Sequence, residues 1–136
     1  MVAMSDASAA SQLAGGFYGL EEKRWRWAAR EFAVMLEPPR NADETGAELQ
    51  LQLFIPDKQI QDLGPMTLNA DVDGYALEPR TLASGGGNTQ TWEVPAAALR
   101  SSLVRVNFSF DKAMPPTSAD ARELAAVVTR AGLIVK

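Results

Sequence analysis

The chain contains neither cysteine nor histidine among its 136 residues. Without cysteine it has no disulfide framework, no thiolate nucleophile and no thiolate metal ligand. Such a chain suits a reducing compartment, and we expect a cytoplasmic protein. Without histidine, the commonest general base and the commonest metal ligand are missing as well. We therefore expect no enzymatic activity, no cofactor and no metal site.

A basic surface and a long apolar run are also missing. Lysine and arginine number 13 against 17 acidic residues, which gives a net charge of -4, and the arginines are scattered among acids. A protein that binds a phosphate backbone needs a basic stripe, so we expect no nucleic-acid partner. No stretch approaches the roughly 20 apolar residues that cross a bilayer, so we expect no membrane span.

The length fits one domain. Residues 1–15 are rich in alanine and serine and lack the features of a signal peptide. We interpret them as a flexible leader, followed by a single domain over residues 16–136.

Period-two alternation dominates that domain. In the clearest example, Leu49, Leu51 and Leu53 alternate with polar residues and, at the end of the run, with Phe54. Similar patterns cover residues 66–72, 104–110, 32–36 and 90–94. Each pattern predicts a strand with one buried and one solvated face. Together they predict an all-β protein: an antiparallel β-sandwich, jelly-roll-like.

Turns and short helices complete this prediction. Asp73-Gly74 between two strand-like runs is typical of a tight hairpin. Proline at a first helical position predicts short helical turns over residues 56–63 and 95–100. Residues 117–131 contain helix formers, yet their alternation favours a strand from about residue 123 to 135 with a kink near Gly132.

The segment 16–27 concentrates large aromatic and charged residues. Trp25 and Trp27 lie two positions apart, so in a strand they share a face that is opposite to Arg26. An exposed pair of indoles can stack on the apolar face of a sugar while nearby charges bind its hydroxyls. The candidate ligand-binding residues are Tyr18, Glu21, Trp25, Arg26 and Trp27. The alternative is that both tryptophans cover one end of the sandwich core.

The charges of the same segment suggest a structural role. Glu21 and Glu22 are adjacent, and adjacent side chains of an extended chain point apart, so they do not form a catalytic pair. We expect one of them to pair with Arg26 or Arg122, which would join the first strands to the last.

Residues 69–74 resemble the start of a calcium-binding loop, because oxygen ligands alternate before Gly74. The twelfth position would be Arg80, where such a loop needs a bidentate glutamate. We interpret the segment as a solvated strand that ends in a hairpin turn.

These features together resemble a family. The resemblance rests on short motifs spread over residues 15–136, at Gly16, Phe17, Tyr18, Glu21, Trp25, Arg26, Trp27, Pro38, Pro115, Pro116, Asp120, Arg122 and Leu124. The chain resembles a β-sandwich accessory domain found fused to bacterial glycosyltransferases and related surface-polysaccharide proteins. It departs from the family at Ala125, where glycine is usual, and at Asp73, where asparagine is usual. The resemblance implies a jelly-roll-like fold and an association with glycan assembly.

Two functions follow from these observations. The first is a non-catalytic carbohydrate-binding or glycan-associated accessory module, with a carbohydrate ligand and a glycosyltransferase partner. The second is a protein-interaction or spacer domain that docks on a partner enzyme or on itself, with no ligand of its own.

Overall fold

The computed structural model describes residues 2–4, 12–21, 25–117 and 122–135. The strands are β1 (Val2–Ala3), β2 (Leu13–Glu21), β3 (Trp25–Leu36), β4 (Ala47–Ile55), β5 (Met66–Val72), β6 (Tyr75–Ala76), β7 (Arg80–Leu82), β8 (Gly86–Val94), β9 (Val104–Phe110) and β10 (Ala126–Val135). The helices are α1 (Ala42–Thr45), α2 (Asp57–Leu63) and the 3-10 turn η2 (Ala96–Ala98). Within these described ranges, no helix combines the length and the apolar character needed to cross a membrane.

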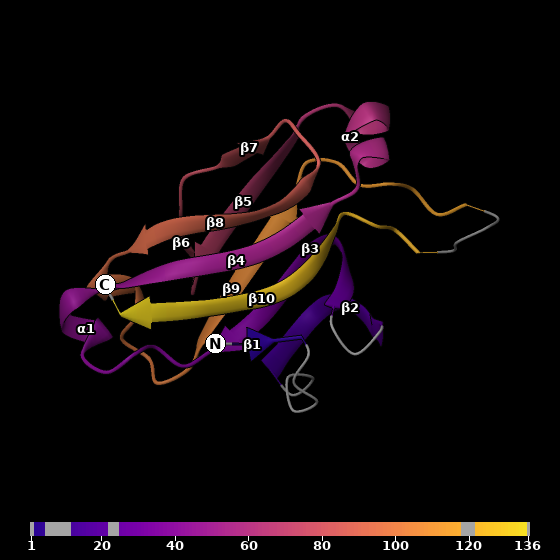
Figure 1. Cartoon of the computed structure of the whole chain (residues 1–136). Helices are drawn as coiled ribbons and strands as arrows, with labels where there is room; N and C mark the ends of the chain where they lie inside the picture. Colours follow the sequence, from indigo (N-terminus) through magenta and orange to yellow (C-terminus); the bar gives the residue numbers. More distant parts are fainter. Residues whose placement is uncertain (1, 5–11, 22–24, 118–121, 136) are drawn as a thin grey trace.

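All the strands belong to one antiparallel sheet, whose main order is β6-β5-β9-β3-β10-β4-β8. The sheet curls over on itself, so that the layer of β10, β4 and β8 packs against the layer of β3, β9 and β5 (Figure 1). Strand β3 belongs to both layers, because its first part pairs with β10 and its second part pairs with β9. The expected all-β antiparallel sandwich is confirmed, and the crossovers that insert β9 and β10 between earlier strands are typical of jelly rolls.

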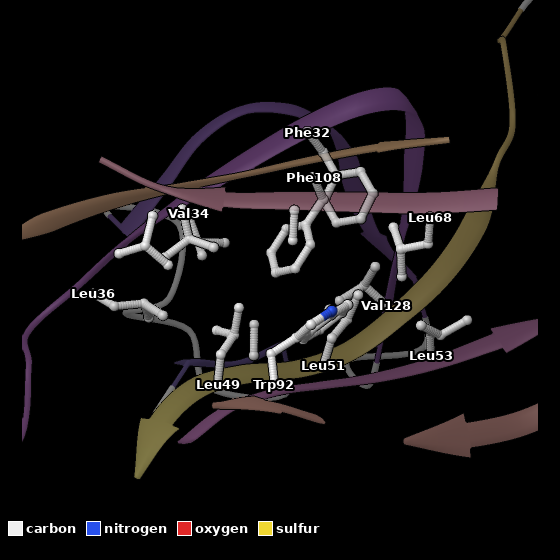
Figure 2. Close-up of a cluster of buried hydrophobic side chains, with 14 of the residues drawn as sticks. Phe32, Val34, Leu36, Leu49, Leu51, Leu53, Leu68, Trp92, Phe108 and Val128 are labelled. Carbon is white, nitrogen blue, oxygen red and sulfur yellow. The ribbon is translucent and has the colours of Figure 1, made fainter. Parts of the chain in front are cut away.

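The alternating side chains form the core between the layers, as the sequence predicted. Figure 2 shows side chains from both layers that point into one interior: Phe32, Val34, Leu68 and Phe108 from one layer, and Leu49, Leu51, Leu53, Trp92 and Val128 from the other. The ring of Phe108 stacks on Phe32 at 5.0 Å and lies 6.0 Å from Trp92. Trp92 is 2% exposed, and its indole N–H donates to the carbonyl of Glu78. Trp92 is therefore the tryptophan of the core.

The predicted turns and helices also appear. Helices α2 and η2 lie within the predicted ranges 56–63 and 95–100. The β5–β6 hairpin turns at Asp73 and Gly74, which have φ of 47° and 87°. Two left-handed residues between paired strands are the backbone that Asp-Gly favours. Helix α1 lies between β3 and β4, outside the ranges in which we expected short helical turns.

The last strand differs from the prediction in its irregularity. The expected kink near Gly132 is wrong, because Gly132 pairs regularly with Gln50. The register instead shifts between Val128 and Arg130. At this point β10 leaves its pairing with β3 and takes β1 as its neighbour. The irregularity therefore lies where the pairing partner of β10 changes.

The first residues also differ from the expected leader. Strand β1 pairs with Ala131 and Arg130 of β10, and Met4 is fully buried. Strand β2 begins at Leu13, so the boundary expected before Gly16 falls inside a strand. Residues 5–11 of the expected leader lie outside the described part of the chain. The apolar side chains of Met4 and Leu13 explain the difference, because both pack with the core.

Candidate functional site

Trp25 and Trp27 lie on the outer face of the sandwich. Trp27 pairs with Val127 of β10, while the neighbouring pairs Arg26–Val128 and Ala28–Ala126 place core residues on the inner face. Paired residues share a face and successive residues alternate, so both indoles point away from the core. Both are half-buried, and neither belongs to the core cluster. Neither tryptophan is therefore part of the core between the two layers, and the alternative in which they cover one end of that core stays a prediction.

Trp27 is part of an apolar row that crosses three strands. Val127 pairs with Phe54 of β4 on one side and with Trp27 of β3 on the other. We call these three residues the aromatic row. Phe54 is 44% exposed, whereas Val127 is 8% exposed and lies outside the core cluster. The row therefore presents an aromatic side chain at each end, with an apolar floor between them.

Polar side chains flank the aromatic row on the same face. Gln52 of β4 pairs with Thr89 of β8 and with Arg130 of β10. Gln52 is the next outward-facing residue before Phe54 along β4. Its row therefore places amide, hydroxyl and guanidinium groups beside the apolar strip. The combination of an aromatic surface with nearby donors and acceptors suits an amphipathic ligand.

Beside the row, Trp27 also lines a small pocket of about 230 Å³. Its walls come from the start of α2 and from the segments before and after residues 118–121, and they include Pro56, Gln59, Met114, Pro115, Arg122 and Leu124. The exposed lining is mainly apolar, so the pocket extends the apolar surface at the Trp27 end of the aromatic row.

The remaining candidate residues hold the first strands to the end of the chain. The Tyr18 hydroxyl donates to the carbonyl of Glu123 at 2.9 Å and accepts from the Glu123 N–H at 3.1 Å. The Arg122 guanidinium lies 5.5 Å from the Tyr18 ring centre and 4.0 Å from the Glu21 carboxylate. Arg26 donates to the carbonyl of Tyr18 at 3.0 Å. We call this set the seam.

The seam confirms the predicted pairing of Glu21 with Arg122. Glu22, the other carboxylate of that prediction, lies outside the described residues. Tyr18 and Arg26 are engaged with each other and with the last segment, whereas Glu21 contacts Arg122, which lines the pocket beside Trp27. Of the five candidate residues, Trp25, Trp27 and Glu21 therefore share one face, because Glu21 pairs with Trp25 in the register of β2 and β3, whereas Arg26 lies on the opposite face.

Removing the Tyr18 hydroxyl tests the seam. Tyr18→Phe is expected to lower the free energy of unfolding by about 2 kcal/mol, because both hydrogen bonds to Glu123 are lost and two partly buried backbone groups lose their partner. Urea unfolding followed by fluorescence measures the change. The matched control is Tyr75→Phe, which removes a hydroxyl from a ring that is 48% exposed and is expected to change stability by less than about 0.5 kcal/mol. Equal losses in the two variants would show that the seam contributes nothing.

The sequence contained a signal for Phe54, a residue of the aromatic row that our candidate set omitted. Phe54 is the apolar exception on the solvated face of β4, where Glu48, Gln50 and Gln52 precede it. An aromatic residue at such a position indicates a surface that binds something. Arg130 and Val127 had no comparable signal, because their face depends on the register of β10.

The calcium-like segment forms the predicted hairpin. Asp71 accepts from the N–H of Gly74, and Asp73 accepts from the N–H of Arg105, so both carboxylates stabilise the turn. Arg80 donates to the carbonyl of Thr91 and lies 5.4 Å from the Trp92 ring centre. Among the residues that the structure describes, no cluster of acidic side chains is arranged to hold a metal ion.

Comparison with known protein-family models found no match, and a search of curated proteins found none either. The resemblance to glycosyltransferase-associated accessory domains therefore stays a prediction from the motifs.

Proposed function

We propose that this protein is a non-catalytic carbohydrate-binding module whose ligand stacks on the aromatic row and on Trp25. The observation that carries the proposal is the position of the two indoles on the outer face, where Trp27 lies in line with the exposed ring of Phe54. The apolar face of a pyranose stacks on such rings, which supply a large rigid contact area. Gln52, Thr89 and Arg130 then supply donors and acceptors for the sugar hydroxyls.

The biological setting of the proposal rests on the family resemblance. Accessory domains of that kind are associated with glycan assembly, so a glycosyltransferase is the proposed partner. The proposed role is to hold a glycan chain near that enzyme, while the chemistry takes place on the partner. A cytoplasmic location fits the absence of cysteine.

The same face also supports a second candidate function. An exposed apolar strip that includes Phe54 is suited to contact with a partner protein or with another copy of the chain. In that function the aromatic row is an interface and binds no sugar. Light scattering at increasing concentration, combined with the sugar titration below, distinguishes the two candidates.

Tryptophan fluorescence tests the proposed function directly. Trp92 is buried in the core, so a change on adding maltotetraose, cellotetraose or xylotetraose reports the environment of Trp25 and Trp27. We expect one of these sugars to change the emission of the wild type. Trp27→Ala is expected to weaken its binding by about tenfold or more, because the loss of stacking and of contact area together exceeds about 1.4 kcal/mol.

The control variant is Leu103→Ala, which removes another exposed apolar side chain, 47% exposed and away from the aromatic row. Its affinity is expected to equal that of the wild type. If no sugar changes the emission, or if Trp27→Ala and Leu103→Ala bind equally well, the aromatic row is not a carbohydrate site.

A further inference from the structure

A second hollow lies on the other layer of the sandwich. It has a volume of about 550 Å³ and lies over β3, β9 and β5. One wall is formed by Gly15 and Gly16 of β2, and the other by Ala76 and Leu77 at the end of β6. The outer faces of the two layers point away from the shared core, so this hollow and the aromatic row are on opposite sides of the molecule.

The floor of the hollow is polar and follows the register of the sheet. Ser109 of β9 pairs with Glu31 of β3 and with Asn69 of β5. In the next outward row, Asn107 pairs with Asp71 on β5. We call this hollow, with its floor, the polar trough. Asn107 also pairs with Ala33 of β3. The small outward-facing side chain of Ala33 leaves space above the sheet at this position.

Part of the floor is fixed in place by hydrogen bonds. The Arg105 Nε donates to the side-chain oxygen of Asn107 at 2.8 Å, and the Asn107 amide donates to Asp71 at 3.0 Å. Asp71 also accepts from the backbone N–H of Gly74 at 3.2 Å, which anchors this set of side chains to the hairpin turn. Polar groups that are held in this way lose little conformational freedom when a ligand binds.

The rest of the floor is available to a ligand. The side chains of Glu31, Asn69 and Ser109 make no hydrogen bond within the part of the chain that the structure describes, and all three line the trough. Glu31 supplies only acceptors, whereas the amide and the hydroxyl both donate and accept. Neighbouring groups of both kinds match the vicinal hydroxyls of a sugar, each of which donates and accepts as well.

We propose that the polar trough is a second carbohydrate site, which binds an uncharged oligosaccharide through its hydroxyl edges and without an aromatic stacking surface. The inference rests on the proposed function, because it assigns a second site of the same ligand class. The volume lies within the range of about 300–1,000 Å³ that is typical of small-molecule sites. Two carboxylates and one guanidinium in the lining leave no strong charge of one sign, which favours a neutral ligand over an ionic one. With one site on each outer face, a single molecule holds two glycan segments.

The test uses the Trp27→Ala variant of the full chain, so that the aromatic row no longer contributes. Maltotetraose, cellotetraose and xylotetraose are added to the ¹⁵N-labelled protein, and the side-chain amide signals of Asn69 and Asn107 are followed by NMR. We expect one of the three sugars to shift both signals in a saturable way. Adding Asn69→Ala and Ser109→Ala to this variant is expected to weaken that binding by about tenfold or more, judged from the Asn107 signal.

Two further variants separate the trough from its surroundings. Ala76→Trp places a large ring at the exposed wall and is expected to abolish the Asn107 shift without removing any polar group of the floor. Gln50→Ala changes the outer face of the other layer and is expected to leave the shift unchanged. A backbone spectrum that is unchanged away from the substituted residue and its neighbours shows in each case that the fold is retained.

The outcomes distinguish this inference from the proposed function. Fluorescence changes in the wild type, with silent amide signals in the trough, would overturn the second site and leave the aromatic row as the binding surface. Amide shifts that persist at full strength after Asn69→Ala and Ser109→Ala would also overturn it. Saturable shifts in the trough with no fluorescence change would support the second site and overturn the role of the aromatic row. No response to any sugar at either position would overturn both.

Discussion

Gly16→Ala is expected to destabilise the protein by about 3 kcal/mol or more, or to prevent folding. Gly16 has φ of 80°, a left-handed backbone that costs an alanine about 1 kcal/mol or more. A Cβ at this position would also lie 2.5 Å from the Phe32 Cα and would overlap the carbonyl oxygen of Glu31. These are backbone atoms of β3, which the ladder with β9 holds in place, so the overlap is relieved only by separating β2 from β3.

A second glycine of the same strand provides the control. Gly19 has an ordinary backbone conformation, and a Cβ there would have no atom within 4 Å. Gly19→Ala is expected to unfold at the same urea concentration as the wild type or slightly above it, because alanine restricts the unfolded chain. Urea midpoints that are equal for Gly16→Ala and Gly19→Ala would mean that β2 does not need its close approach to β3.

Phe108→Ala is expected to lower the free energy of unfolding by about 4 kcal/mol. Phe108 is 2% exposed at the centre of the core, between Phe32 of its own layer and Trp92 of the other (Figure 2). Truncation removes buried apolar surface and leaves a cavity that the sheets cannot fill. A buried phenylalanine that is replaced by alanine typically lowers the free energy of unfolding by about 3–5 kcal/mol. Because domains are stable by only about 5–15 kcal/mol, this loss is a large fraction of the total.

Phe54→Ala makes the same chemical change on the outer face. Its ring is 44% exposed, so the expected loss is below about 1 kcal/mol. Urea unfolding of both variants, followed by circular dichroism, measures the difference. Comparable losses would contradict the placement of Phe108 in the core and of Phe54 on the surface. A small loss for Phe54→Ala also makes this variant suitable for sugar binding, because its effect on affinity can then be separated from unfolding.

The strands and turns of this fold could be predicted because their signals are local. In a sandwich each strand buries one face, so Leu49, Leu51 and Leu53 mark both the strand and its inner side. Asp73-Gly74 marks a hairpin because the required left-handed backbone excludes most other residues. The short segment β1 gave no such signal, since its place depends on pairing with β10.

The candidate site could be predicted only in part, because the face on which its side chains lie depends on pairing with a strand that is distant in the sequence. The alternation showed that Trp25 and Trp27 share a side opposite to Arg26, but not which side is inner. That choice depends on the register that pairs Arg26 with Val128 and Trp27 with Val127. The Glu21–Arg122 pair could be predicted from opposite charges. The bonds between Tyr18 and Glu123 could not, because they use backbone groups that every residue carries.

Strand β3 has a consequence for how the protein is made. It obtains a neighbour from its own hairpin early, but its other neighbours, β9 and β10, come from the last part of the chain. The seam likewise joins residues 105 positions apart. Closing such long loops makes folding slow, and until β10 is synthesised β3 and β4 each have an edge that can pair with another chain. Synthesis of this protein therefore passes through a period of aggregation risk that lasts until β10 has been added.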